Sequence, residues 1–350
     1  MKRVYIVLVN WNGWADTLEC LESLLQLDYP DYRVVIVDND SSDSSVARIR
    51  AWACDDLDLL SVGPEGSNIK PSTSRSLRFL EYDQSRDADS HPVASEADIV
   101  LIRSHANLGF AAGNNLGLNY VQMHNDAAYV WLLNNDTFVD PASLSALVSR
   151  IKSKPLAGIC GSTLLRYDDP GRVQALGGAY YCRLLALAWH LGQWRRLPAN
   201  VDAERVERWM SYVVGASMLV SREFLEQVGL MSEDYFLYYE EIDWVTRARG
   251  RFTLGYATDS LIYHKVGGSI GTRSHPGRKS LICDYYSLRS RILFTRRYFP
   301  KVMPIVRLGL CVEFLTRLLF GKWQRAGMVL SLMTSGRQLP PVTDFMTDET

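Results

Sequence analysis

Amide and carboxylate side chains gather in a few short stretches of this chain, and the most informative of them follows an apolar run. Val130–Leu133 stops abruptly at Asn134, Asn135 and Asp136. Such a run predicts a strand inside a parallel sheet, and ligands bind at the carboxyl ends of such strands. A carboxylate placed there can hold a divalent cation, which can hold a diphosphate. The alternative is a polar turn after a core strand.

Polar groups also follow three other expected strands, at 4–9, 34–37 and 99–102. Because parallel strands end at one edge of a sheet, we expect these groups to line one site, where glycines let the backbone approach a ligand. The pattern outlines a nucleotide site, but it contains neither the GxGxxG dinucleotide fingerprint nor a P-loop. The candidate nucleotide-binding residues are Asn10, Asn12, Asp38, Asp40, Asn107, Gly109, Asn114, Asn135 and Asp136.

A second acidic cluster, at Glu240, Glu241 and Asp243, lies among aromatic residues near an expected helix start. Like charges this close cost free energy unless something uses them, and sugar rings stack on Tyr and Trp faces. The three carboxylates are therefore candidates for catalysis, and the alternative is a solvated first turn of a helix. His264 ends a short apolar strand before a glycine turn, which makes it either a ligand or a structural histidine.

Alternating strand and helix patterns predict an α/β fold with a doubly wound, mostly parallel sheet. Helices are expected near 16–27, 109–124, 221–229 and 240–249. Further strands are expected at 213–220, 254–258 and 260–264, and the chain after them is mostly helical. The Ser-, Pro- and Gly-rich stretch 55–97 reads as a loop-rich insertion.

Composition narrows the class of protein and its partners. The chain has 350 residues with 38 Lys plus Arg against 39 Asp plus Glu, so net charge gives no argument for nucleic acid. The six cysteines show no metal-binding spacing, which fits free thiols in a reducing cytosol. Met1–Arg3 leads straight into a strand, so we expect no signal peptide and a cytoplasmic protein.

Together these motifs resemble the family-two inverting glycosyltransferases, which have the GT-A fold, and more closely their bacterial rhamnosyltransferase-like branch. The resemblance covers about residues 4–300. Each motif is weak alone, but six in this order are specific for the family. They are 9–13, 38–43, 107–117, 133–136, 215–218 and 239–243.

The resemblance implies roles for the candidate residues. The segments at Asn10 and at 38–40 would contact the base and ribose, and a glycine loop at 109–115 would close over the nucleotide. Asp136 stands where the family has its DxD motif, and it would bind Mg²⁺ or Mn²⁺ and the diphosphate. Asn134 replaces the first Asp of that motif, which leaves one carboxylate where two can occur. His264 matches a further metal ligand of some members.

Glu241 matches the catalytic base of the family, with Glu240 and Asp243 as alternatives. The expected reaction is a single displacement that moves L-rhamnose from dTDP-L-rhamnose to a cell-envelope glycan or a lipid-linked saccharide. A UDP-sugar donor is the alternative within the same chemistry, and a non-catalytic nucleotide-sugar-binding scaffold is the alternative outside it.

The expected organisation is a catalytic domain at 1–275, a helical extension at 276–337 and a polar tail at 338–350. Basic and apolar residues alternate through 285–320, with Arg307, Glu313 and Arg317 interrupting its last helix. This segment predicts either peripheral contact with the inner face of the cytoplasmic membrane or packing on the catalytic domain or on a second subunit.

Overall fold

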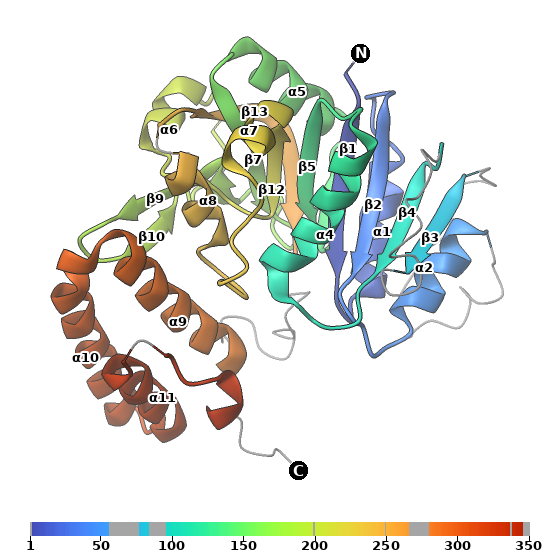
Figure 1. The fold of residues 1–350 in the computed structure, drawn as a ribbon. Coiled ribbons are helices and arrows are strands. Elements are labelled where there is room, and N and C mark those ends of the chain that lie inside the picture. The colour runs from blue at the N-terminus through green and yellow to red at the C-terminus, as the bar shows by residue number, and fades with distance from the viewer. Residues whose placement is uncertain are drawn as a thin grey trace.

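In a computed structural model of the chain, ten strands of the described residues form one large mixed sheet (Figure 1). The strand order is β3-β4-β2-β1-β5-β12-β7-β13-β6, with β8 paired to β7. Neighbours from β3 to β5 are parallel, as are β7 and β13, whereas β12 is antiparallel to β5 and β7. The predicted α/β class with a mostly parallel sheet is confirmed. The structure describes residues 2–55, 77–83, 96–198, 200–248, 250–265, 280–336 and 338–345.

The elements have the following bounds. The strands of the large sheet are β1 Val4–Asn10, β2 Tyr32–Asp38, β3 Phe79–Asp83, β4 Ile99–Arg103, β5 Tyr129–Asn134, β6 Thr137–Val139, β7 Ala157–Arg166, β8 Val173–Leu176, β12 Ser217–Ser221 and β13 Thr253–His264. A small antiparallel sheet contains β9 Gly178–Cys182, β10 Leu187–His190 and β11 Tyr212–Val213. The α-helices are α1 Trp14–Leu24, α2 Ser45–Ala53, α4 Gly109–His124, α5 Ser143–Ser153, α6 Ala203–Trp209, α7 Arg222–Val228, α8 Glu240–Ala248, α9 Leu281–Tyr298, α10 Met303–Leu319 and α11 Trp323–Thr334.

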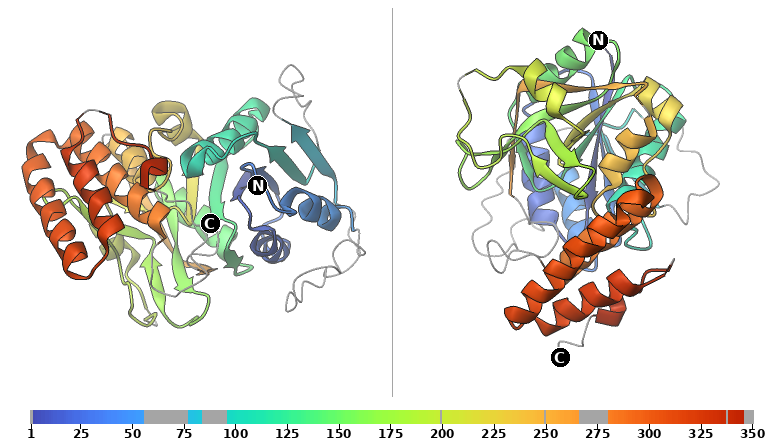
Figure 2. Two further views of the ribbon diagram at one scale, coloured as in Figure 1. Left: turned by 90° about the horizontal axis from the view of Figure 1, so that it is seen from below. Right: turned by 90° about the vertical axis from the view of Figure 1, so that its left-hand side faces the viewer.

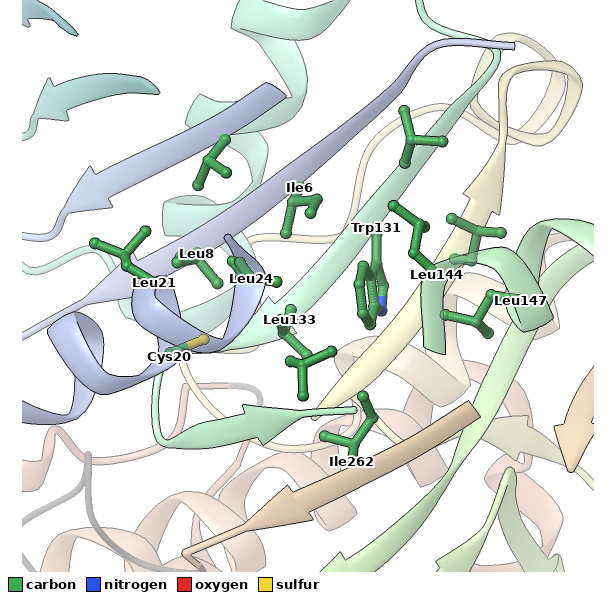
Figure 3. Packing of buried hydrophobic residues seen from close by; sticks show 14 of the residues in the cluster. Ile6, Leu8, Cys20, Leu21, Leu24, Trp131, Leu133, Leu144, Leu147 and Ile262 are labelled. Carbon is green, nitrogen blue, oxygen red and sulfur yellow. The ribbon is translucent and has the colours of Figure 1, made fainter. Parts of the chain in front are cut away.

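Helices cover both faces of the large sheet. On one face, α1, α2 and α5 pack over a core that includes Trp131 and Leu144, part of which Figure 3 shows. On the other face, α4, α7 and α8 pack over a second core that includes Val7 and Trp244. The central strands are therefore buried on both faces, which is why they read as continuous apolar runs in the sequence.

Three predicted elements differ from the structure. The single strand expected at 213–220 divides into β11 and β12, because the chain turns at 214–216 and the two parts join different sheets. The two strands expected at 254–258 and 260–264 form one strand, β13, whose register shifts between Ala257 and Leu261. The insertion expected to be loop-rich contributes β3, which pairs in parallel with β4, and most of its other residues lie outside the described ranges.

The C-terminal helices α9, α10 and α11 lie together at one end of the molecule, next to β9 and β10 (Figures 1 and 2). They share a third apolar core with the rest of the chain, to which Tyr181 of β9, Ile242 of α8 and Leu288 of α9 belong. This core fixes the extension to the elements that carry the acidic cluster. Within the described residues, no helix is long and apolar enough to cross a membrane.

Candidate functional site

The carboxyl ends of β1, β2 and β5 lie side by side, because these strands are parallel neighbours. Asn10 Nδ2 donates to Asp38 Oδ1 at 2.8 Å, and Asn10 Oδ1 accepts from the Thr17 hydroxyl at 2.8 Å. Asn135 Nδ2 donates to Thr17 Oγ1 at 2.8 Å. The structure thus brings three predicted site residues together, and their buried side chains hold the strand ends to one another.

The turn after β2 is hydrogen-bonded to the turn after β1. Asn12 Oδ1 accepts from the backbone N–H of Ser42 at 2.8 Å and from that of Asp43 at 3.2 Å. Asn12 and Asp40 both have positive φ, 50° and 64°, and both side chains are exposed. A non-glycine residue in the left-handed region is uncommon, and Asn and Asp tolerate it best. Two consecutive turns are therefore shaped so that exposed amide and carboxylate groups stand at the strand ends.

The helix expected near 109–124 is α4, which begins at Gly109, so the segment 109–115 that the resemblance implied as a glycine loop is helical. Asn107 Oδ1 accepts from the Gly109 N–H at 3.0 Å and from Asn39 Nδ2 at 3.1 Å, so it holds the entry to the helix. Asn114 Nδ2 donates to the carbonyl of Phe110 within the helix at 2.9 Å. A Cβ on Gly117 would lie 2.4 Å from Val7 Cγ1, so a glycine face lets α4 lie close against β1.

Gly109 also lies close to Phe236, which precedes the acidic cluster in the chain. Its φ is +81°, and a Cβ there would lie 2.3 Å from the carbonyl oxygen of Phe236. We expect Gly109→Ala to lower the free energy of unfolding by about 3 kcal/mol, because backbone strain and a clash add. Gly250 is the matched control, with φ +74° and no atom of the described residues within 4 Å of its Cβ position. Gly250→Ala should cost only about 1 kcal/mol of strain. Urea denaturation of both variants measures the difference, and equal costs would contradict the close approach.

Asp136 and His264 meet where the β5–β6 turn passes the end of β13. His264 pairs with Thr137 across the β13–β6 ladder, and the Lys265 N–H donates to the Asp136 carbonyl at 3.0 Å. His264 Nε2 lies 3.1 Å from Asp136 Oδ1, with both side chains buried. On its other side, His264 Nδ1 lies 2.8 Å from Gln174 Oε1. Residues more than a hundred positions apart are thus brought together at the strand ends.

The hydrogen bond to Gln174 decides what Nε2 of His264 can do. Gln174 Oε1 accepts from Nδ1 in one tautomer of His264, and that tautomer turns the Nε2 lone pair toward the carboxylate of Asp136. Two acceptors attract each other only through a proton or a cation between them. Adjacent ligands of an octahedral cation, each about 2.1 Å from it, lie about 3.0 Å apart. The pair therefore fits a divalent cation, with Gln174 as the outer partner that orients the ring.

The pair offers two side-chain atoms of the kind that bind such a cation. Among the residues that the structure describes, no group of three or more His, Cys, Asp or Glu side chains gathers as a metal site. A magnesium-like cation usually takes only one or two carboxylates from a protein and completes its shell with water and substrate phosphates. The donor set is consequently suited to a cation that arrives with a diphosphate.

The acidic cluster follows a strained turn. Tyr238 and Tyr239 have φ of 66° and 74°, and α8 begins at the next residue, Glu240. Consecutive aromatic residues in the left-handed region cost of order 1–3 kcal/mol each, so the surroundings must impose this conformation. The Ser290 hydroxyl donates to the carbonyl of Leu237 at 3.0 Å, and the Tyr239 hydroxyl donates to that of Ala186 at 2.8 Å. Contacts from α9 and from the β9–β10 turn thus hold the helix start in place.

Glu241 is joined to the strand-end edge through the turn at 214–216. Its Oε1 accepts from the Gly215 N–H at 3.1 Å, and a Cβ on residue 215 would lie 2.4 Å from that oxygen. The neighbouring carbonyl of Ala216 accepts from the Asn134 N–H at 3.0 Å. Burial raises the pKa of Glu241, which suits a carboxylate that takes up a proton. Glycine at 215 is required so that this carboxylate can approach the backbone.

Glu240 is almost completely buried, and its Oε2 has no hydrogen-bond partner among the described residues. Burial, with a further contribution from Glu241, raises its pKa well above the ordinary value. A carboxyl whose pKa is higher in the folded state favours folding below its unfolded pKa and loses that contribution as pH rises.

We therefore expect Glu240→Gln to raise the free energy of unfolding at pH 7. At that pH the wild-type carboxyl ionises freely in the unfolded state, whereas burial opposes its ionisation in the folded state. The gain should shrink as the pH falls through the ordinary range of a glutamate, because the wild-type carboxyl is then protonated in both states. Denaturant titrations at several pH values measure this. A gain that does not depend on pH would contradict the raised pKa.

Asp243 differs from the two glutamates, since donors surround its carboxylate. Asp243 Oδ1 accepts from the Tyr298 hydroxyl at 2.7 Å, and Oδ2 accepts from Arg247 Nε at 2.8 Å. Arg297 lies 3.5 Å away, and the Tyr235 hydroxyl lies 3.3 Å away. Tyr298 and Arg297 belong to α9, so this buried carboxylate links the C-terminal helices to α8.

Sequence reasoning did not find Gln174, Gly215 as a partner of Glu241, or the pair Arg297 and Tyr298. Gly215 belongs to the motif at 215–218, so the sequence indicated that Gly215 belongs to the site. It did not indicate the hydrogen bond from the Gly215 N–H to Glu241. Gln174 lies on β8 and contacts a side chain that is distant in sequence, and no spacing rule connects the two.

Two cavities lie at the opposite edge of the sheet, where β5 begins. One is lined by Val121, Tyr129 and Arg222, and the other by Arg3, Asp126 and Arg222. They are therefore separated from Asp136 and Glu241 by the length of the sheet, and the candidate site is the strand-end edge.

Comparisons with known proteins identify relatives among the glycosyltransferases. The family model described as glycosyl transferase family 2 matches residues 5–60 and 82–229. The chain is 25% identical over 209 residues to the low-salt glycan biosynthesis hexosyltransferase Agl10 of Haloferax volcanii. The matched residues make up 59% of this chain and 65% of the relative, so the chain spans just under two thirds of that protein. It is 26% identical over 220 residues to the N-acetylglucosaminyl-diphospho-decaprenol L-rhamnosyltransferase of Mycobacterium tuberculosis, covering 57% of this chain and 70% of the relative.

Solved structures share the fold. The mannosyltransferase PcManGT of Pyrobaculum calidifontis, in complex with GDP-Man and Mn²⁺, matches with a TM-score of 0.50 at 15% identity, over 98% of this chain and 77% of its own. GalNAc-T7 with UDP, GalNAc and Mn²⁺ matches with a TM-score of 0.51 at 13% identity, over 83% of this chain and 47% of its own. At such identities the likeness concerns the fold alone, and the fold is the GT-A fold expected from the motifs.

Proposed function

Since this chain belongs to glycosyl transferase family 2, we propose that it moves L-rhamnose from dTDP-L-rhamnose to a cell-envelope glycan or a lipid-linked saccharide. The chain carries a glycosyltransferase domain of that family over more than half of its length, so a nucleotide-sugar donor follows from membership. The choice of sugar is supported by the motifs of the rhamnosyltransferase-like branch and by the similarity to an L-rhamnosyltransferase.

The observation that carries the proposed mechanism is the contact between Glu241 and the Gly215 N–H beside the strand ends. In the proposed reaction, Glu241 takes the proton of the acceptor hydroxyl. The hydroxyl oxygen forms a bond to the anomeric carbon as the bond from that carbon to the diphosphate oxygen breaks. The nucleoside diphosphate leaves with the electron pair, and one displacement inverts the configuration of the sugar.

Asp136 and His264 are the proposed holders of Mg²⁺ or Mn²⁺. Their paired acceptor atoms, 3.1 Å apart, support this assignment. When bound, the cation would neutralise the charge that grows on the leaving diphosphate. The protein's own part is to fix the two ligand atoms, which the bond from His264 to Gln174 does for the ring. With Asn134 in place of a second carboxylate, the site brings less negative charge to the cation.

The remaining residues have proposed supporting roles. Exposed groups of the turns at 10–13 and 38–43 bind the base and ribose, and the buried Asn10, Asp38 and Asn135 fix those turns. We propose that Asp243 anchors α9 and leaves proton transfer to Glu241, because its carboxylate already accepts from Arg247 and Tyr298. The proposed organisation is a catalytic domain at 1–275 with a loop-rich insertion at 55–97, a helical extension at 276–337 and a polar tail at 338–350.

A donor panel tests the proposed function. Purified protein with Mn²⁺ is titrated calorimetrically with dTDP-L-rhamnose, UDP-glucose, UDP-galactose, GDP-mannose and NADH. The proposal predicts selective, metal-dependent binding of dTDP-L-rhamnose. Binding of a UDP-sugar instead would overturn the choice of donor and keep the chemistry. Folded protein that binds none of the sugar nucleotides would overturn the proposed function in favour of a different role for the fold.

A further inference from the structure

The outer face of α10 carries a continuous row of exposed apolar side chains. Spaced three and four residues apart, the row lies along one side of the helix. Its members are exposed to between 40% and 86% of their full area, which is unusual for large aliphatic residues in a row. We call this row the apolar face of α10, and it consists of Ile305, Leu308, Val312, Leu315 and Leu319.

The opposite side of α10 is already buried against other helices. Val306 and Leu310 are buried in the core that α10 shares with α9 and α11. A helix on the surface of a protein in water normally turns polar side chains outward, and one that is apolar all round has a second apolar partner. The row continues past the helix end, where Phe320 is 74% exposed and Trp323 is 70% exposed. We therefore expect this face to bind a partner that can bury aliphatic and aromatic side chains together.

Charge along the segment 299–334 is strongly one-sided. From 299 to 334 the chain has one acidic residue, Glu313, and it is engaged by Arg291 Nη1 at 2.8 Å and lies 3.5 Å from Arg317. The charged side chains of this segment that stand exposed are all basic. They are Lys301, Arg307 and Lys322, at the start of the segment, within α10 and just before α11.

We propose that the apolar face of α10, with Phe320, Trp323 and these three basic residues, docks on an anionic lipid surface. A helix of this type lies in the membrane interface, with its apolar side among the acyl chains and its basic groups near anionic headgroups. Tryptophan is enriched at that depth because its ring is apolar and its N–H is polar. A second copy of the chain fits less well, since it would bring the same basic residues together without acidic partners.

The structure corrects the extent of the membrane contact expected from the sequence. That expectation ran from 285 to 320, but α9 is an internal helix whose Tyr285, Leu288, Ile292 and Phe294 are buried. The docking surface is therefore α10 and the start of α11. Because α9 carries Tyr298 and Ser290, which hold Asp243 and the carbonyl of Leu237, the surface is one helix away from the acidic cluster.

This inference deepens the proposed acceptor, a lipid-linked saccharide, but its test does not depend on any sugar transfer. The full chain is floated with vesicles of phosphatidylcholine alone or of phosphatidylcholine with phosphatidylglycerol. Binding to the anionic vesicles is expected, and it should weaken with salt. Replacing Lys301, Arg307 and Lys322 with Gln should lower the partition coefficient about a hundredfold, since each basic residue near an anionic surface contributes about fivefold.

A second variant tests the apolar face. Leu308→Ser, Val312→Ser and Leu315→Ser together should lower binding at least tenfold, and the control is Leu156→Ser, which is 65% exposed in the turn before β7. Circular dichroism and light scattering report folding and size. Wild-type protein that stays lipid-free with both vesicles, or variants that bind as well as wild type, would overturn the proposal. So would a wild-type dimer that the Ser variant converts to a monomer without any vesicle binding.

Discussion

Glu241→Gln is expected to lower turnover by a factor of about 10³, with donor affinity little changed. Glutamine keeps the shape of the side chain and can still accept from the Gly215 N–H, but it cannot take up a proton. The loss should therefore fall on turnover. Nucleoside diphosphate release measures turnover, and calorimetry with dTDP-L-rhamnose measures affinity.

The control for this variant is Glu204→Gln, an exposed glutamate in the first turn of α6. It should leave both quantities unchanged. Because burial raises the pKa of Glu241, wild-type turnover should rise with pH through a range above that of an ordinary glutamate. Near-normal turnover in Glu241→Gln would show that another group takes the proton.

Asp136→Asn is expected to lower donor affinity in the presence of Mn²⁺ by about a hundredfold. The variant keeps the size of the side chain but removes the charge of the carboxylate that lies 3.1 Å from His264 Nε2. Loss of an outer partner of a metal ligand already costs about 10–100-fold, and loss of the ligand itself costs at least as much. The measurement is calorimetric titration of dTDP-L-rhamnose with Mn²⁺ and again with EDTA.

With EDTA, wild type and Asp136→Asn should bind the donor alike, because the difference between them is carried by the cation. Asp168→Asn, at an exposed surface ion pair with Arg166, is the control and should behave as wild type. If Asp136→Asn retains full metal-dependent affinity, the cation is held elsewhere or is not needed for donor binding.

The sequence predicted the fold where local patterns were strong. The apolar runs at β1, β2, β4 and β5 are buried on both faces, and such runs leave little choice but central parallel strands. It also predicted which polar groups would gather, because parallel strands end at one edge. The division into β11 and β12 was not predicted, since Val213–Val220 contains a single polar residue, Ser217, and periodicity alone does not reveal a change of sheet.

The resemblance implied a loop at 109–115, whereas the local pattern predicted a helix at 109–124, and α4 confirms the helix. Glycine is common in loops, but a spacing of four also lets a helix approach a strand closely, and only the three-dimensional contact with Val7 distinguishes the two. Similarly, Glu240, Glu241 and Asp243 look alike in sequence. Their differences arise from Gly215, Arg247 and Tyr298, two of which are distant along the chain.

The decisive measurement is the release of dTDP from dTDP-L-rhamnose, which phosphorus NMR can follow on the full chain with Mn²⁺. We expect wild-type protein to release dTDP, with water as acceptor, and Glu241→Gln to bind the donor but to release almost none. Release that is equal in wild type and in Glu241→Gln would rule out Glu241 as the base. Folded wild-type protein that binds dTDP-L-rhamnose and never releases dTDP would rule out the proposed transfer reaction.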